Sequence, residues 1–268
     1  MNTIFTSPNF SLEKLNQVYV VLTSKNCNQR CKQCYMDFPV SKRVNDFLDI
    51  NRVKEMLMDI RKESLNCIYL TGAEPMLHPH FNNILRMCLK RTNVCICTNA
   101  SLINEKKARF FKKVEDEGHY GLFFRISFSH YEEQKNDLAR YRGAFRQSLF
   151  AIKSLEKYGF SVIVEVVNYY NIDESELSQG FFELFTRYEI SPDLFIQSYF
   201  SKEDSSEYNG KEKDCMYSRT LASNGVYSCP YLANDYRGRM GADFKDYSKS
   251  IKAETPFCAS CSICAVTL

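Results

Sequence analysis

The sequence predicts an α/β fold, in which a parallel sheet with crossover helices precedes a small cysteine-rich tail. Two observations support this prediction. Between residues 17 and 200, six short apolar runs alternate with segments of helical periodicity, a pattern typical of parallel strands joined by helices. The chain also contains 12 cysteines in 268 residues, and five of them lie after residue 214, where long periodic segments are rare.

The expected strands are short and rich in β-branched or aromatic residues, and they cover 18–22, 67–70, 94–97, 123–128, 161–167 and 194–200. The expected helices cover 50–62, 81–89, 104–117, 144–158 and 173–188. The apolar runs do not alternate cleanly with polar residues, which favours strands covered on both faces. The alternation ends near Phe200, and the polar stretch 201–214 is interpreted as a linker.

Composition narrows the possible classes of protein. Hydrophobic residues make up 44% and charged residues 25% of the chain, as in ordinary globular proteins. A net charge of +3 is too small to indicate a nucleic-acid-binding surface. No run approaches the ~20 apolar residues of a membrane span, and Met1–Phe5 lack the pattern of a signal peptide. We therefore expect a cytoplasmic protein, in which clustered cysteines indicate metal binding or catalysis.

Three of the cysteines lie on one short segment directly after the first expected strand. Cys27, Cys31 and Cys34 have the spacing C-x3-C-x2-C. Three thiolates on one loop can hold a 4Fe–4S cluster and leave one iron open, and an open metal position can bind a substrate or cofactor. A zinc loop is the alternative, but zinc loops mostly use paired C-x2-C knuckles, and no second pair lies nearby.

This segment resembles the signature of the radical S-adenosylmethionine (radical SAM) enzymes, which follows the first strand of a partial (β/α)6 TIM-like barrel. The resemblance implies that S-adenosylmethionine binds the open iron and is cleaved reductively to a 5′-deoxyadenosyl radical, which abstracts hydrogen from a substrate. It makes Cys27, Cys31 and Cys34 both metal ligands and catalytic residues. The family often has an aromatic residue before the third cysteine; Gln33 stands there, and Tyr35 is the candidate for packing against the adenine.

Further motifs follow in the order that the resemblance implies. Thr71–Pro75, with the sequence T-G-A-E-P, resembles the G-G-E-P turn of the family. Carbonyl groups at Gly72 and Ala73, with the Glu74 carboxylate close by, would accept hydrogen bonds from the ammonium group of the cofactor. Thr98–Ala100 resembles the T-N-G that ends the third strand.

The last three cofactor candidates lie later in the expected barrel. Ser127, in a segment that resembles I-S-L-D-G, would contact the methionine carboxylate or the ribose. Arg142 resembles the arginine of R-G-x-F and would pair with that carboxylate, which suits a planar guanidinium. Asn168 ends the fifth strand, where the family often has a ribose-binding asparagine. Taken singly, Ser127 and Asn168 could merely cap strand ends, and we assign no role to His78 or His130.

The tail carries a second set of cysteines: Cys215, Cys229, Cys258, Cys261 and Cys264. Their arrangement resembles the SPASM and shorter Twitch extensions, which implies one auxiliary 4Fe–4S cluster. Four ligands are needed; we favour the first four, and the choice stays open. An unligated Cys264 could donate a hydrogen atom to a substrate radical. A structural zinc site is the alternative. Four remaining cysteines are expected to be ordinary buried residues, namely Cys67, Cys88, Cys95 and Cys97.

The resemblance divides the chain into a lead-in (1–16), a radical SAM barrel (17–200), a linker (201–214) and an auxiliary-cluster extension (215–268). Enzymes with such extensions crosslink, epimerise or oxidise ribosomally made peptides, or act as dehydrogenases or epimerases of small molecules such as sugars and aminocyclitols. Because 1–16 is too short for a leader-recognition domain, a peptide substrate would bind without one or through a separate recognition protein.

We expect peptide modification slightly ahead of small-molecule oxidation or epimerisation. The expected partners are the substrate and a reducing protein such as a flavodoxin or ferredoxin, with no membrane or nucleic acid. A hypothesis of another class is a non-enzymatic, cysteine-rich zinc-binding module.

Overall fold

A computed structural model describes residues 9–36, 46–199, 214–248 and 251–252. The chain falls into two compact units. The first unit contains Met1–Val21, Leu48–Ile68 and Phe200–Leu268, and the second contains Leu22–Phe47 and Tyr69–Tyr199. Strand β3 (Cys67–Thr71) is divided between them.

The second unit consists of repeated strand–helix segments. After β3, its strands are hydrogen-bonded in chain order, and the pairs from β4 to β7 are all parallel. These strands are β4 (Asn93–Thr98), β5 (Leu122–Phe128), β6 (Val162–Asn168) and β7 (Asp193–Ser198). The helices are α2 (Phe81–Leu89), α3 (Glu105–Asp116), α4 (Glu133–Ala139), α5 (Ala144–Lys157) and α6 (Glu174–Tyr188). Parallel neighbours require such crossover connections.

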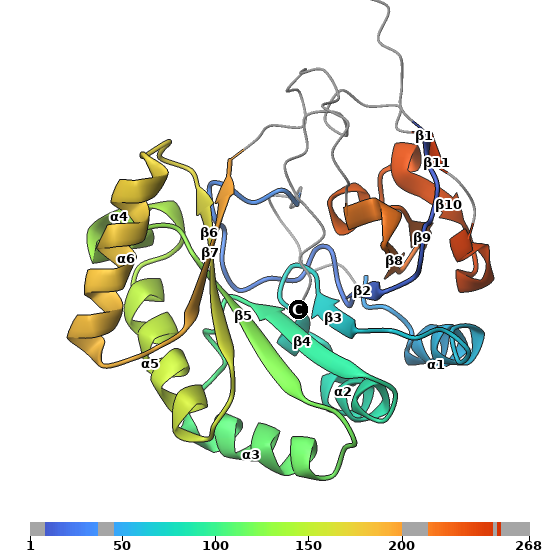
Figure 1. Cartoon of the computed structure of the whole chain (residues 1–268), viewed down its shortest axis with the longest axis horizontal. Helices are drawn as coiled ribbons and strands as arrows, with labels where there is room; N and C mark the ends of the chain where they lie inside the picture. Colours follow the sequence, from blue (N-terminus) through green and yellow to red (C-terminus); the bar gives the residue numbers. More distant parts are fainter. Residues whose placement is uncertain (1–8, 37–45, 200–213, 249–250, 253–268) are drawn as a thin grey trace, which may run out of the picture. The chain divides into compact units, whose positions relative to one another are not determined.

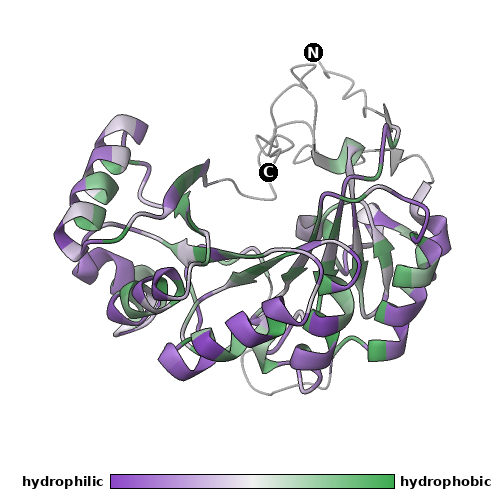
Figure 2. Cartoon of the chain, turned by 60° about the horizontal axis from the view of Figure 1, so that its bottom comes forward, coloured by the Kyte–Doolittle hydropathy of each residue, from purple (hydrophilic) through white to green (hydrophobic). Residues whose placement is uncertain are grey.

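One face of β4–β7 is apolar and covered by helices. Phe124 packs against Phe111 of α3, and Phe128 packs against Phe145 of α5 and Phe181 of α6, with ring centroids 5.3–5.9 Å apart. Figure 1 shows the helices on one side of these strands, and Figure 2 shows green strands beside helices with purple outer faces. Burial of this apolar face is the main favourable contribution to the stability of the unit.

The opposite face of the same strands carries polar side chains. Cys97 pairs in register with Arg125, and Ser127 with Glu165, while Gln197 lies on β7 two residues beyond the partner of Glu165. Paired residues of parallel strands share a face, and side chains alternate between faces along a strand. We call Cys97, Arg125, Ser127, Glu165 and Gln197 the polar face.

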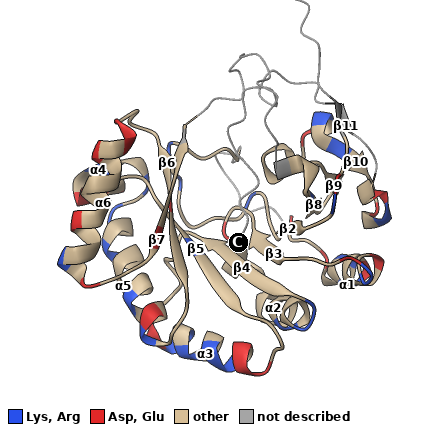
Figure 3. Ribbon diagram, viewed as in Figure 1, with Lys and Arg blue, Asp and Glu red and all other residues tan. Residues whose placement is uncertain are grey.

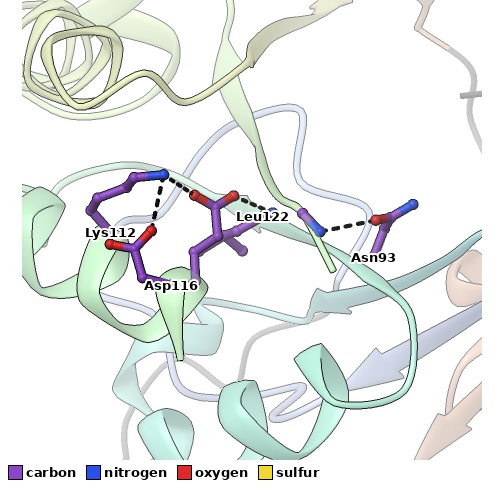
Figure 4. A network of polar contacts seen from close by, with 6 residues as sticks. Asn93, Lys112, Asp116 and Leu122 are labelled. Carbon is purple, nitrogen blue, oxygen red and sulfur yellow. Dashed lines mark hydrogen bonds and ion pairs between the residues drawn. The ribbon is translucent and has the colours of Figure 1, made fainter. Parts of the chain in front are cut away.

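A network at the start of β5 fixes the connection from α3 (Figure 4). Glu115 accepts a hydrogen bond from the amide of Leu122 (2.8 Å) and pairs with Lys112. The side chain of Asn93 accepts one from the amide of Gly121 (3.0 Å). These contacts satisfy amides at the amino end of the strand, opposite to the carboxyl ends where active sites of such folds lie, so we interpret the network as structural.

The first unit places tail strands beside the first strand of the sheet. Strand β8 (Ser218–Ala222) pairs in parallel with β2 (Gln17–Val21). Strand β9 (Gly225–Tyr227) pairs antiparallel with β8, and β10 (Arg239–Gly241) pairs antiparallel with β9. The unit also contains α1 (Ile50–Asp59) and a two-residue ladder between β1 (Asn9–Phe10) and β11 (Ile251–Lys252).

Helix α1 is joined to the tail through one arginine. Arg52 donates hydrogen bonds to the carbonyl oxygens of Ser223 (2.6 Å) and Ala242 (2.5 Å). The β8–β9 hairpin turns at Gly225, where φ is +150° and a Cβ would lie 2.4 Å from the carbonyl oxygen of Gly241. Only glycine fits this close approach.

The predicted α/β fold is confirmed. The six strands expected before residue 200 are β2–β7, and the five expected helices are α1, α2, α3, α5 and α6, within a few residues at each end. Helix α4 was not predicted, and neither was the pairing of a tail strand with β2. The expected linker, apart from its last residue, lies outside the described residues.

Charged residues lie mostly on helices, as Figure 3 shows for α1, α3 and α6. None of the helices in the described ranges combines the length and the apolar character that crossing a bilayer requires.

Candidate active site

The three clustered cysteines lie on one loop of the second unit, after β2. Cys27, Cys31 and Cys34 are free thiols. The amide of Cys34 donates to the carbonyl oxygen of Cys31 (3.2 Å), and that of Lys32 donates to the carbonyl oxygen of Ala139 at the end of α4 (2.8 Å). Partial burial, with the charges of Cys31 and Cys27, raises the pKa of Cys34 to about 11. The three thiols are therefore close enough to interact electrostatically.

Two N–H groups point at the sulfur of Cys27. The amide of Gln29 lies 3.3 Å away and the side-chain nitrogen of Asn99 3.6 Å away. Burial raises the pKa of the Cys27 thiol, and these two donors partly oppose the rise because they favour the thiolate. A metal-bound thiolate at this position would keep both hydrogen bonds.

The turn after β3 packs closely against the start of the cysteine loop and is hydrogen-bonded to it. Gly72 has φ +133°, and a Cβ there would lie 2.4 Å from the carbonyl oxygen of Thr23. The amide of Ala73 donates to the same oxygen (2.7 Å), and the amide of Glu74 donates to that of Asn26 (3.1 Å). Glycine is required at position 72 for both its φ angle and this contact.

Glu74 joins this turn to the end of β4. Its carboxylate is fully buried and accepts hydrogen bonds from the amide of Met76 (3.1 Å), the hydroxyl of Thr98 (2.9 Å) and the amide of Asn99 (3.0 Å). Burial raises its pKa to about 7. Both carboxylate oxygens already bind the chain, so Glu74 supports the turn from within. Asn99 continues the connection to Cys27 and to the side chain of Asn28 (2.9 Å).

Asp46 is a site residue that sequence reasoning missed. Its carboxylate accepts hydrogen bonds from the hydroxyl of Thr23 (2.6 Å), the amide of Ser24 (2.7 Å) and the side chain of Asn26 (2.6 Å). It therefore fixes the segment that leads into Cys27. No motif marks this aspartate, because its three partners lie at least 20 positions away in the sequence.

Tyr35 and Ser127, two predicted cofactor residues, lie near the polar face. The hydroxyl of Tyr35 is hydrogen-bonded to the side chain of Thr71 and interacts electrostatically with Cys97 and Glu165. Burial raises the pKa of this tyrosine. The hydroxyl of Ser127 lies 3.5 Å from the carbonyl oxygen of Thr98. The structure thus brings both residues toward the carboxyl ends of β3–β5.

Asn168 and Arg142 are placed differently. The side chain of Asn168 donates to the carbonyl oxygen of Ile172 (2.6 Å) and accepts from its amide (3.0 Å), so it closes the turn after β6. Arg142 is exposed. The guanidinium beside the cysteine loop belongs to Arg140, which is 7% exposed and donates to the side chain of Gln29 (3.3 Å). Its charge lowers the pKa of Cys34 and of Glu74.

Several buried polar atoms around the loop lack partners in the part of the chain that the structure describes. They are Nε2 of Gln29, Oε1 of Gln33 and Nε of Arg140. Each such atom costs roughly 1–3 kcal/mol if it stays unsatisfied. Three free thiols on one loop, with a buried cation and unsatisfied polar atoms beside them, fit a negatively charged cluster with a polar cofactor.

A site for a single metal ion fits less well. Among the described residues, no three or more His, Cys, Asp or Glu side chains are arranged to hold one ion. A 4Fe–4S cluster does not require such convergence, because each thiolate binds a different iron. This distinction favours a cluster over the zinc loop.

In the tail, only Cys215 and Cys229 fall within the described residues. The fully buried guanidinium of Arg219 donates to the carbonyl oxygens of Cys215 (2.6 Å) and Tyr247 (2.6 Å), and so anchors the Cys215 segment. Cys258, Cys261 and Cys264 lie outside the described residues. Of the cysteines expected to be buried, Cys97 is half-buried and the other three are buried.

Comparison with known families decides the assignment. The profile described as "Radical SAM superfamily" matches residues 21–179, more than half of the chain. The chain belongs to the radical SAM superfamily. It is therefore a radical SAM enzyme that depends on a 4Fe–4S cluster and S-adenosylmethionine, and the zinc-module hypothesis is set aside. No protein of curated function matches the sequence significantly.

Solved structures with a similar fold include three proteins with TM-scores above 0.5. SuiB of Streptococcus suis, bound to precursor peptide SuiA, is 12% identical in sequence and has a TM-score of 0.68. The match covers 89% of this chain and 66% of the SuiB chain. AnSMEcpe with bound AdoMet is 14% identical, with a TM-score of 0.66 over 91% of this chain and 80% of that one. BtrN in complex with AdoMet and 2-DOIA is 16% identical, with a TM-score of 0.52, and the match covers 86% of this chain and 78% of the BtrN chain.

Proposed function

We propose that Cys27, Cys31 and Cys34 hold the 4Fe–4S cluster of this radical SAM enzyme. The supporting observation is the connection of the cysteine loop to the turn after β3 through Asn99 and Glu74. When bound, the cluster and S-adenosylmethionine supply a 5′-deoxyadenosyl radical. The test is anaerobic reconstitution with iron and sulfide, then dithionite and S-adenosylmethionine; 5′-deoxyadenosine should form, and its absence from cluster-loaded protein would contradict the proposal.

The turn after β3 is proposed to receive the ammonium group of the cofactor. Carbonyl oxygens at Gly72 and Ala73 are the acceptors, and Glu74 holds these carbonyls in place from within the fold. For the cofactor carboxylate, the buried Arg140 is a better candidate than the exposed Arg142, because a guanidinium away from water binds a carboxylate more strongly.

Three further residues keep their predicted roles as proposals. Tyr35 is the candidate for contact with the adenine, and Ser127 for contact with the carboxylate or ribose. Asn168 would bind the ribose only if its two hydrogen bonds to Ile172 were exchanged for bonds to the cofactor.

The tail is proposed to be a SPASM- or Twitch-like extension with one auxiliary 4Fe–4S cluster. Its ligands would be four of Cys215, Cys229, Cys258, Cys261 and Cys264, and Cys264 is the candidate hydrogen-atom donor if it is not a ligand. The similarity to SuiB and anSMEcpe supports this, because it covers 89–91% of the chain and therefore includes part of the tail.

The proposed reaction is modification of a ribosomally made peptide by crosslinking, epimerisation or oxidation. A dehydrogenase or epimerase of a small molecule, such as a sugar or aminocyclitol, is the second candidate. The SuiB structure contains a precursor peptide and the BtrN structure contains 2-DOIA. Because the chain is only 12–16% identical to these proteins, they do not decide between the two substrate classes. A cytoplasmic location, a flavodoxin or ferredoxin as reductant and a separate peptide-recognition protein remain predictions from the sequence.

A further inference from the structure

Two oppositely charged side chains lie together on the polar face, Arg125 buried and Glu165 half-buried. Arg125 is 7% exposed, and its Nη1 lies 3.6 Å from Oε1 of Glu165 on the neighbouring strand. Burial of two charges costs several kcal/mol per ion, and replacement by apolar residues is often neutral or stabilising. The other face of the same strands shows that this sheet can pack with apolar residues alone. A functional role would explain why this costly pair is present.

Aromatic rings hold the guanidinium of Arg125 in place. Its central carbon lies 5.4 Å from the ring centroids of both Tyr69 and Phe195. Contacts of this kind use the faces of the planar guanidinium. The N–H groups lie along its edges, where they can donate to an oxygen atom. The distance of 3.6 Å to Glu165 exceeds the ~2.7–2.9 Å of a charge-assisted hydrogen bond.

Glu165 has acceptor capacity left. Its Oε1 accepts a hydrogen bond from the side chain of Gln197 (2.5 Å). Its Oε2 has no hydrogen-bond partner among the described residues, and the side chain is 17% exposed. A carboxylate offers about four lone-pair positions, so a donor on a bound molecule could reach it.

The polar face adjoins the cysteine loop. Tyr35 directly follows Cys34 in the chain, and its hydroxyl interacts electrostatically with both Glu165 and Cys97. Ser127, the register partner of Glu165, lies one residue from the end of β5. A molecule held by Glu165 would therefore lie on the side of the sheet that bears the cofactor candidates.

We propose that Arg125 and Glu165 recognise a hydroxyl group of the substrate, close to the carbon that loses hydrogen. This inference rests on the proposed function and names the substrate chemistry. A hydroxyl group donates to Glu165 and accepts from Arg125 at the same time. A lone carboxylate or ammonium group would be attracted by one member of the pair and repelled by the other, so the net-neutral pair selects a neutral group.

Deuterated probes test the proposal and distinguish two sources of the hydroxyl. One probe is a short capped peptide with perdeuterated serine, and the other is perdeuterated myo-inositol; the same peptide with perdeuterated alanine is the control. Each is incubated anaerobically with cluster-loaded protein, S-adenosylmethionine and dithionite. Abstraction breaks a C–D bond of the probe and forms a C–D bond in 5′-deoxyadenosine, which mass spectrometry detects.

We expect label from at least one hydroxyl probe and none from the alanine peptide. Glu165→Gln should lower the labelled fraction at least tenfold and leave total 5′-deoxyadenosine within twofold. Glu156→Gln is the matched control, because that carboxylate accepts a hydrogen bond from the amide of Ser191, just before the amino end of β7. It should leave the labelled fraction unchanged. Arg125→Gln leaves Glu165 uncompensated and should shift labelling toward a peptide with perdeuterated lysine.

Unlabelled 5′-deoxyadenosine from both hydroxyl probes, equal labelling from the alanine peptide, or an unchanged labelled fraction in Glu165→Gln would each overturn the inference. Failure to form any 5′-deoxyadenosine would instead contradict the proposed cluster site. A circular dichroism melt shows whether a variant is folded. If Glu165→Gln is not folded, the Arg125→Gln variant tests the inference instead: a shift of labelling toward the lysine peptide supports it, and no shift overturns it.

Discussion

Replacement of Glu74 by alanine tests how the turn after β3 is held. The change leaves three buried donors without an acceptor, on Met76, Thr98 and Asn99, at roughly 1–3 kcal/mol each. Against this, removal of a carboxyl whose pKa is raised from 4.5 to about 7 recovers about 3 kcal/mol, the net cost of keeping it ionised in the folded protein above pH 7. With a middle value for each donor, we expect a net loss of about 3 kcal/mol.

The assay is urea unfolding of cluster-free protein at pH 8, with affinity for S-adenosylmethionine measured on the cluster-loaded form. The carbonyl groups of this turn are the proposed acceptors for the cofactor. A turn that has lost its support should therefore bind the cofactor about a hundredfold more weakly, equivalent to about 3 kcal/mol. Glu117→Ala is the control: its carboxylate pairs with Arg86 at the surface and should contribute less than about 1 kcal/mol. An unfolding free energy and an affinity both within error of the wild type would refute the reasoning.

Glu74 also predicts a pH dependence. Its pKa is higher in the folded than in the unfolded state, so its contribution to stability is complete below pH 4.5 and is lost as the pH rises toward about 7. Glu74→Gln removes this titration. The stability of the variant relative to the wild type should therefore increase between pH 5 and 7 and then level off; a difference independent of pH would show that Glu74 does not titrate in this range.

Four further outcomes are expected. Cys31→Ala should abolish formation of 5′-deoxyadenosine and lower iron by about four atoms per chain, with iron of the proposed tail cluster unaffected; retained cleavage would rule out this loop as the cluster site. Asp46→Asn should lower iron incorporation at the loop, measured by iron analysis, and equal loading would assign Asp46 no positioning role. Arg140→Gln should weaken S-adenosylmethionine binding at least tenfold, measured by calorimetry, and Arg142→Gln should not; the reverse order would restore Arg142. Cys229→Ala should keep 5′-deoxyadenosine but stop product formation if an auxiliary cluster accepts the substrate electron, whereas joint loss of both would indicate a structural tail.

Local patterns in the sequence predicted the elements and the cysteine loop. Strand and helix identities follow from runs and periodicities within about 15 residues, and the loop and turn follow from motifs of five to eight residues. Helix α4 was missed because Glu133–Ala139 is short and polar, with no apolar periodicity. Arg140 follows directly as its C-cap, so its burial could not be predicted without the helix, and the motif directed attention to Arg142 instead.

Residues that act through distant contacts were not predictable from such patterns. In the sequence, nothing distinguishes Asp46 from an ordinary surface aspartate. Its role depends on hydrogen bonds from Thr23 and Asn26, which only the folded chain brings close to it. Glu74 was predicted as a site residue, but its position within the fold was not, because that depends on Thr98 and Asn99 of the next strand.

The polar face did leave a signal in the sequence. Arg125 interrupts the apolar run F-F-R-I-S-F, and Glu165 interrupts V-I-V-E-V-V. A strand covered by apolar layers on both faces has no use for a charge at its centre, since an unpaired charge there is costly. Two opposite charges at the centres of consecutive expected strands can compensate one another only if the strands are neighbours and both charges point to the same face. The pair therefore predicts both the pairing of β5 with β6 and a polar face of the sheet. The proposed hydroxyl-binding site lies on that face.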